Sequence, residues 1–311
     1  MTFSVHVPLL ASLLLAVISR PLVSRLSPRT AARALVVACG LSAAAFTWGL
    51  LLLALTLLHE APPVSERAAP GALAAGQPVP ALVAAAATAA LAVGVYRLAV
   101  VLRSRRSTHH ALQALCDRSA AQELVVVAAA EPHAVAVPGR VGRPWRAGKL
   151  AVPGRILVTS GMLTALDGDE RRVLLEHERA HLRQGHSWQQ GVVDAAAAVN
   201  PLLRPACDSV AFLLERCADE AAADAVGDRP LTARSLARAA LASTSAHRES
   251  SLAFHQLGVP ARVAALAVAP PPVRWSLAAA VVSVGLVTTV AAADATVGFL
   301  ALVHRLLPAG L

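Results

Sequence analysis

Charged and aromatic residues are scarce in this chain. Only 15% of its 311 residues are Asp, Glu, Lys or Arg and 3% are Phe, Trp or Tyr, whereas 56% are hydrophobic and the mean hydropathy is +0.58. A soluble domain has about 25% charged and 45–50% apolar residues. The balance argues against an ordinary soluble protein. It indicates a membrane protein with several spans and one compact soluble domain of roughly 150 residues.

Closely spaced cysteines are also missing. The four cysteines are scattered without a CxxC pair, which argues against a disulfide framework and against a thiolate zinc site. The net charge of +9 raises the question of nucleic acid, but there is neither a basic helix interleaved with aromatics nor a zinc-finger spacing. Much of the basic excess instead lies beside apolar segments. We therefore expect no direct binding of nucleic acid.

Four apolar stretches are long enough to cross a bilayer, which takes about 20 residues. The first is the shortest and resembles a signal peptide. It lacks a basic segment before it and is followed by Arg20 and Arg25, which favours a retained span. The four expected spans are Phe3–Ile18, Ala34–Leu58, Val79–Leu102 and Trp275–Leu307.

The arginines beside these stretches predict an orientation. Residues 20–33 hold four arginines and no acidic residue, and Arg103, Arg105 and Arg106 follow the third span. Basic loops face the cytoplasm in multi-pass proteins. We expect a protein of the cell membrane with its N-terminus outside and the polar segment between the third and fourth spans in the cytoplasm.

The expected domain organisation follows from these spans. Residues 1–106 would form three transmembrane helices, residues 107–272 a cytoplasmic domain, and residues 273–311 the fourth transmembrane helix with a short tail. Within the polar segment, composition and turn signals predict strands and then helices. The fold class is mostly α, with a small α+β domain inserted between the third and fourth spans. The expected strands are Glu123–Ala130, His133–Val137 and Ile156–Thr159, and the expected helices begin at an N-cap at Asp169, near Leu202 (ending at Gly227) and near Thr232.

The stretch around His177 carries the most informative motif, an HExxH pattern. His177 and His181 are four residues apart, so a helix presents both imidazoles on one face, where they can bind one metal ion. Glu178 can act as general base on a water whose pKa the metal lowers. Because HExxH also occurs by chance, a catalytic site requires a third ligand.

Two kinds of third ligand are possible in principle. A histidine completing HExxHxxGxxH is excluded, because positions 184 and 187 are Gln and Ser. A carboxylate on a later helix is available in Glu215, and Asp219 one turn further on could hydrogen-bond a zinc-bound histidine. The role of His186 is left open: it is either a substrate or oxyanion contact, or a surface histidine at the end of the helix.

The order of motifs resembles the BlaR/MecR-type membrane zinc metallopeptidases and their HtpX-like gluzincin relatives. The resemblance covers roughly residues 130–230. It is carried by Val137-Pro138-Gly139, by the segment from Ile156 to Gly161 before the HExxH helix, by Asn200-Pro201, and by Glu-x-x-Ala-Asp from Glu215 to Asp219.

The resemblance implies a zincin-like metallopeptidase domain with Zn2+ as its cofactor. It implies His177, His181 and Glu215 as zinc ligands, Glu178 as catalytic base and Asp219 as support for a ligand. The strand at Val137 would pair with an extended substrate. The penicillin-binding sensor domain of the best-known members would follow the fourth span, where only a few residues remain. We expect a protein without that domain.

The predicted function is an integral-membrane zinc endopeptidase that hydrolyses a protein or peptide substrate by zinc-activated water with a glutamate base. The resemblance suggests a cytoplasmic transcriptional repressor as the substrate. The alternative is a catalytically silent, zinc-binding membrane protein of signalling or scaffold type, and the intact Glu178 argues against it. A transporter is disfavoured because the spans carry few ionisable residues. The oligomeric state is left open.

Overall fold

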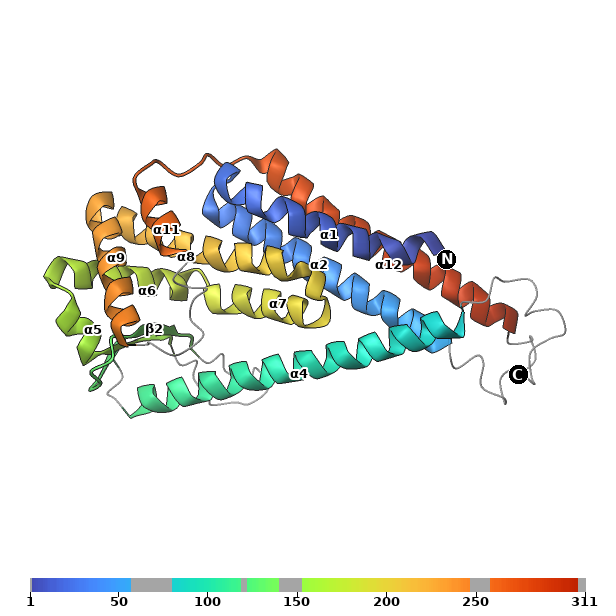
Figure 1. The fold of residues 1–311 in the computed structure, drawn as a ribbon, viewed down its shortest axis with the longest axis horizontal. Helices are drawn as coiled ribbons and strands as arrows, with labels where there is room; N and C mark the ends of the chain where they lie inside the picture. The colour runs from blue at the N-terminus through green and yellow to red at the C-terminus, as the bar shows by residue number, and fades with distance from the viewer. Residues whose placement is uncertain (1, 57–79, 119–121, 140–152, 247–257, 307–311) are drawn as a thin grey trace.

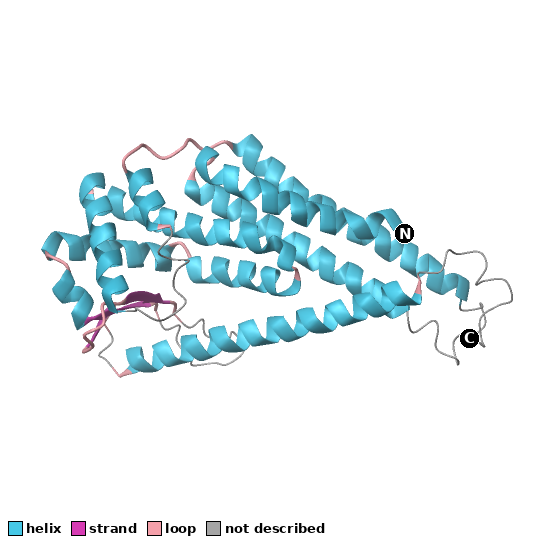
Figure 2. Cartoon of the chain, in the orientation of Figure 1, coloured by secondary structure: helices cyan, strands magenta, loops and turns pink. Residues whose placement is uncertain are grey.

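The computed structural model describes residues 2–56, 80–118, 122–139, 153–246 and 258–306, and this part of the chain is mostly helical (Figure 2). The expected fold class is confirmed: the chain forms four long helices, and the segment between the last two of them contains a small mixed sheet and several shorter helices, with the sheet at one end of the molecule (Figure 1). In chain order the principal elements are α1 (Thr2–Arg25), α2 (Pro28–Leu55), α4 (Ala81–Asp117), β1 (Leu124–Val127), β2 (Ala134–Val137), β3 (Arg155–Thr159), α5 (Ser160–Ala165), α6 (Gly168–Arg183), α7 (His186–Val199), the 3-10 helix η2 (Pro201–Leu203), α8 (Arg204–Val226), α9 (Arg229–Ala246), α11 (Val259–Leu266) and α12 (Trp275–Leu306).

Four of these helices, α1, α2, α4 and α12, are long and apolar enough to span a membrane, as the sequence predicts. Small residues let α12 approach α2 closely: a Cβ atom on Gly285 would lie 3.0 Å from the Cα atom of Ala38. Nearer the other end of the same pair, the Trp48 indole Nε1 donates to the Thr296 hydroxyl at 2.8 Å. Helices α1, α2 and α12 thus form one bundle, with α4 leaning against α2 (Figure 1).

Helix α4 is longer than the span predicted from hydropathy. It continues without a break to Asp117, so the expected domain boundary at residue 106 falls inside a helix. The segment beyond residue 106 contains Ala, Leu and Gln and has neither Gly nor Pro, a composition that favours continuation of a helix. The polar end of α4 contacts strand β2.

The three predicted strands form one mixed sheet in the order β1-β3-β2. Strand β1 pairs with β3 in parallel, with Val125 opposite Leu157, and β2 pairs with β3 in antiparallel, with Ala136 opposite Ile156. Among the described residues β2 therefore lies at an edge. Helix α6, which carries the HExxH motif, packs against this strand.

The start of α6 corrects one prediction. Asp167, not Asp169, is the N-cap: its carboxylate accepts from the Glu170 backbone N–H at 2.9 Å, and the Glu170 carboxylate accepts from the Asp167 N–H at 3.0 Å. This reciprocal pair is a capping box, which requires a Glu or Gln three residues after the cap. Asp169 has Arg172 at that position, and it lies in the first turn of the helix instead.

The helices α7 and α8 do not form a separate soluble core. Their buried residues join those of the membrane helices in one hydrophobic cluster. Representative members of the shared cluster are Leu15 and Leu22 of α1, Leu35 and Cys39 of α2, Val193 of α7, Val210 and Leu213 of α8, and Val281 of α12.

The C-terminal end of α8 agrees with the prediction, because Gly227 ends the helix in a left-handed conformation with a φ of 76°.

Gly161 at the start of α5 supports a first prediction. A Cβ atom at this position would lie 2.0 Å from the carbonyl oxygen of Ala130, so any side chain would push the backbone apart. We expect Gly161→Ala to destabilise the protein by about 2 kcal/mol or more. Gly168→Ala is the matched control, because nothing lies within 4 Å of its Cβ position. Thermal unfolding in detergent measures both, and equal midpoints for the two variants would contradict the packing argument.

Candidate metal centre

Three helices bring the expected site residues together, and a fourth adds one that was not expected. Helix α6 carries His177, Glu178 and His181, and α8, which packs against it, carries Glu215. One ligand atom from each of His177, His181 and Glu215 lies within 4.8 Å of the others, which is the spacing of a group that could hold a metal ion. Helices α7 and α11 contribute His186 and Arg262, as described below. The sequence prediction that His177, His181 and Glu215 meet is thus reproduced by the geometry.

The distances among these three residues fit a zinc ion. The Nε2 atoms of His177 and His181 are 3.1 Å apart. Oxygens of the Glu215 carboxylate lie 3.7 Å from the first and 3.6 Å from the second. Ligands bound tetrahedrally at 2.0–2.1 Å are separated from one another by about 3.3 Å. Two imidazoles and one carboxylate are also a known zinc donor set that leaves a fourth position open.

Asp219 contacts the outer nitrogen of the first histidine. Its carboxylate oxygen lies 3.1 Å from His177 Nδ1. Because Nε2 of the same ring faces His181, this contact fixes both the ring orientation and the nitrogen available to a metal. The carboxylate is almost fully buried. The role expected for Asp219 from its position one helical turn after Glu215 therefore has a structural basis.

His186 plays the corresponding part for the second histidine. Its Nδ1 atom lies 2.9 Å from Nδ1 of His181, at the first residue of α7. Only 3% of His186 is exposed, so the surface position considered from the sequence is not found. Gly185, with a φ of 64°, allows the sharp turn from α6 that places His186 beside His181. Each histidine of the HExxH motif thus has a side chain against its outer nitrogen.

Glu178 lies beside this cluster and next to the sheet. It is 8% exposed, and its carboxylate has a hydrogen bond with the backbone of Ala136 in the edge strand β2. Burial raises the pKa of Glu178, and the nearby charges of His177 and Glu215 act on it in opposite directions. A partly desolvated carboxylate next to a candidate metal cluster is suited to accept a proton.

The electrostatics of the histidines differ. Burial lowers the pKa of His177, but hydrogen bonds to Asp219 and Glu215 outweigh it and raise that pKa to about 10. Burial, together with the charge of His177, lowers the pKa of His181 to about 3, and burial also lowers the pKa of His186 to about 4. The carboxylates thus favour positive charge at the point where His177 and His181 meet. A divalent cation placed there would benefit from the same carboxylates.

Arg262 is the residue of the site that the sequence analysis missed. Its guanidinium binds both oxygens of Asp219 at 2.7 Å, and a third nitrogen lies 2.9 Å from Glu215. It is buried in α11, a short helix otherwise made of apolar and small residues. A lone arginine in such a helix is a signal, because a buried guanidinium requires a carboxylate partner. Its partner lies 43 residues earlier, which no local pattern reveals.

One family model matches the chain, and the match falls on this site. Residues 145–203 match the model described as Peptidase family M48. The matched segment includes His177, Glu178, His181 and His186 and ends before Glu215. No curated protein and no solved structure matches the chain. The matched segment is less than half of the chain, and it indicates a zinc metallopeptidase inserted between the third and fourth membrane helices.

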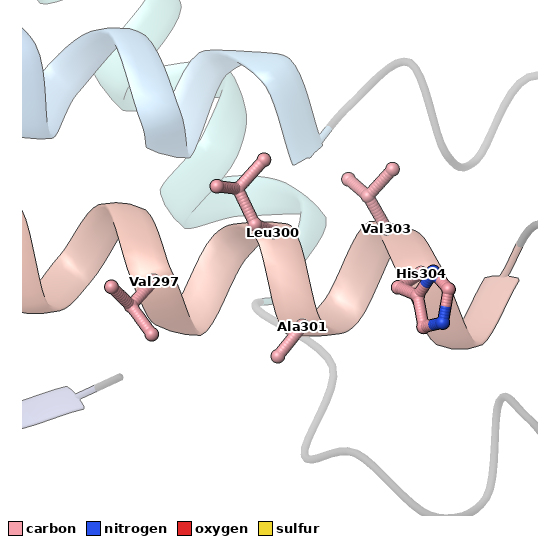
Figure 3. A pocket seen from close by; sticks show the side chains of 5 residues that line it. All are labelled: Val297, Leu300, Ala301, Val303 and His304. Carbon is pink, nitrogen blue, oxygen red and sulfur yellow. The ribbon is translucent and has the colours of Figure 1, made fainter.

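An open hollow near the end of α12 is unrelated to this chemistry. Five side chains of α12 border an open volume of about 600 Å³ near the end of that helix, at Val297, Leu300, Ala301, Val303 and His304 (Figure 3). Apolar atoms provide most of its lining, and it belongs to the terminal end of a candidate membrane span. We assign it no part in metal binding.

Arg262 supports a second prediction. In Arg262→Ala, the buried carboxylates of Asp219 and Glu215 lose their cationic partner, so their positions relative to His177 become less defined. We expect the affinity for zinc to fall by about 10–100-fold, as for other partners of metal ligands. Competition with a chromophoric chelator measures the affinity, and Arg262→Lys should recover part of it. An unchanged affinity in both variants would contradict a positioning role.

Proposed function

We propose that this chain is an integral-membrane zinc endopeptidase that hydrolyses peptide bonds of a protein substrate. The observation that carries the proposal is the convergence of His177, His181 and Glu215 at zinc-like spacing, with Glu178 beside them. The family match over the HExxH segment supports it. In this proposal the three residues bind the metal, and Asp219 and His186 orient the two histidines.

The reaction requires one proton to be moved from water to the leaving amine. Bound zinc would lower the pKa of a water molecule and stabilise negative charge on the substrate carbonyl oxygen. Glu178 accepts a proton of the attacking water and gives it to the leaving nitrogen as the carbon–nitrogen bond breaks, so that a neutral amine departs. Its burial excludes competing solvent from this transfer.

Strand β2 is the proposed binding edge for the substrate. The backbone of Ala136 forms a hydrogen bond with Glu178, so the hydrogen-bonding groups of Ala136 point away from β3. Every second residue of an antiparallel strand has its backbone groups turned in that same direction. Val137 is buried, so the strand would bind substrate through its backbone rather than through this side chain. An extended peptide added to this edge would lie next to Glu178.

Orientation, domain organisation and partner are further parts of the proposal. The charge of Arg29 acts on His186 beside the metal cluster, and Arg105 donates to the backbone carbonyl of Ser187, the next residue along the chain. This supports a cytoplasmic position for the peptidase segment, residues 107–272. A cytoplasmic repressor remains the substrate class that the sequence resemblance suggests.

Metal removal tests the proposed function. Protein purified in detergent should contain about one zinc per chain and cleave casein. A chelator should abolish cleavage, and added zinc should restore it. Zinc without cleavage of casein or of a co-expressed candidate substrate would favour the silent scaffold protein instead. The lack of bound zinc would overturn the site assignment itself.

A further inference from the structure

Helices α7 and α8 form a hairpin whose tip lies against the middle of a membrane helix. At the tip, the Asn200 side-chain amide donates to the Ser12 hydroxyl of α1 at 2.8 Å, and Asn200 is fully buried. Ser12 belongs to the candidate span His6–Arg25. A segment that the sequence assigns to the aqueous side therefore contacts a residue at membrane depth.

Contacts along α8 show that this helix runs beside α1 toward the arginine end of the span. After the contact of Asn200 with Ser12, the Ser209 hydroxyl donates to the Ser19 hydroxyl at 3.2 Å. Further on, the Arg216 guanidinium lies 3.5 Å from the Val23 carbonyl. Both helices advance in the same direction, so α8 emerges from the span level as it approaches the metal cluster.

Contacts along α7 give the same result on the other side of the hairpin. A Cβ atom on Gly94 of α4 would lie 3.6 Å from the Cα atom of Val199. Closer to the end of the α4 span, Arg97 donates to the Ala197 carbonyl at 3.3 Å. Arg105 of α4 pairs with Asp194 at 2.5 Å. Helix α7 thus enters beside the apolar part of α4 (Figure 1).

The composition of the tip suits this depth. Residues 195–203 read Ala-Ala-Ala-Ala-Val-Asn-Pro-Leu-Leu and contain no ionisable side chain. The polar Asn200 uses its amide on Ser12 and its carbonyl oxygen on the Leu202 N–H at 3.2 Å. Backbone that leaves a helix at membrane depth requires such partners. Asp194 is neutralised by Arg105, and the charges of Arg204 and Arg20 both act on Asp208, one helical turn beyond Arg204.

We propose that the α7–η2–α8 hairpin is a re-entrant element that dips into the bilayer and holds the metal cluster at the membrane surface. Ser12 precedes Arg20 by eight residues, so the tip lies about 12 Å beyond the level of Arg20. Glu215 follows the tip by fifteen residues, or about 22 Å of helix, which leaves the metal cluster about 10 Å on the aqueous side.

Trp188 gives independent support for the depth of the hairpin. It lies on α7 and is 70% exposed, although tryptophan is a large apolar residue. Its neighbour Ser187 accepts a hydrogen bond from Arg105, which places this turn at the arginine end of the α4 span. An exposed indole beside arginines at the end of a span is typical of the membrane–water interface.

Spin-label accessibility in liposomes tests the proposal without using cleavage or zinc. The four native cysteines, which are all buried, are first replaced by serine or alanine. A label at Pro201→Cys, an exposed tip position, is compared with Leu10→Cys in the α1 span and Thr164→Cys at the exposed end of α5. We expect the tip label to collide with oxygen more than with a water-soluble nickel complex, as at Leu10. Nickel accessibility equal to that at Thr164 would overturn the proposal, and it would indicate a water-filled cleft.

A second measurement needs no change at the tip. Wild type and Trp188→Phe are reconstituted in lipids brominated in the upper acyl chain, and the difference in fluorescence gives the Trp188 contribution. We expect brominated lipid to quench this contribution by at least about half relative to unbrominated lipid, because the indole lies at the interface. Equal Trp188 fluorescence in both lipids at every protein density would contradict the proposal. Quenching that appears only after the protein is diluted to monomers would support the same depth, and it would show that a second copy covers the indole at higher density.

Discussion

Replacement of Glu178 by glutamine should lower the rate of peptide hydrolysis by about 10²–10⁴-fold. Glutamine preserves the size of the side chain and its place between α6 and β2. It cannot accept a proton from the attacking water, so the reaction loses its base. Glu178 lies outside the three-residue metal cluster, so the zinc content should stay at the wild-type value.

The measurement pairs metal analysis with initial rates of casein cleavage. Glu176→Gln is the matched control, because Glu176 lies on the same helix and pairs with Arg179 and Arg183 at the surface. Loss of such surface pairs has a small effect, typically below about 1 kcal/mol. If Glu178→Gln cleaves at the wild-type rate, then another group is the base. If it loses zinc as well, its role is structural.

Replacement of Glu215 by alanine should remove zinc from the protein. Only His177 and His181 would then remain of the described ligand set. Two imidazoles are one ligand short of the three protein ligands that a catalytic zinc site uses. Partners that only orient a ligand cost 10–100-fold in affinity when lost, so loss of a ligand should exceed about 100-fold. The remaining charge of Arg262, 2.9 Å from Glu215, would further repel a cation.

Competitive chelator titration and inductively coupled plasma analysis would both report this loss. Asp224→Ala is the control, since Asp224 is an exposed carboxylate on the same helix. Zinc should remain at wild-type occupancy in that variant, and its unfolding temperature should match that of wild type. Retention of zinc with wild-type affinity in Glu215→Ala would show that the third ligand lies elsewhere.

The parts of the site that the sequence predicts are those encoded by short spacings. His177 and His181 share a face because four residues make about one helical turn, and Asp219 follows Glu215 by the same interval. The C-terminal end of α8 can also be predicted from the local sequence, because Gly227 tolerates the left-handed conformation found there. Glu215 was a candidate third ligand because a later helix offers its carboxylate, and the resemblance, rather than a spacing, implied that it faces the two histidines.

The parts that the sequence does not predict depend on contacts between distant elements. Arg262 acts on Asp219 from another helix, and the burial of His186 follows from the turn at Gly185. The position of α7 and α8 was also missed. Hydropathy separates spans from polar segments, but it cannot show that Asn200 meets Ser12 across 188 residues.

The single core shared by spans and peptidase segment has an evolutionary consequence. A span that only anchors a protein can drift freely among apolar sequences, because lipid accepts any of them. Here α1 and α2 present Ser12, Ser19 and Ala31 to the interior, where they are fully buried. We therefore expect substitutions among homologous chains to accumulate at lipid-facing positions such as Val17 and to be rare on the inner face. In such a chain, substitutions on the inner face of the membrane helices require matching substitutions in the peptidase segment.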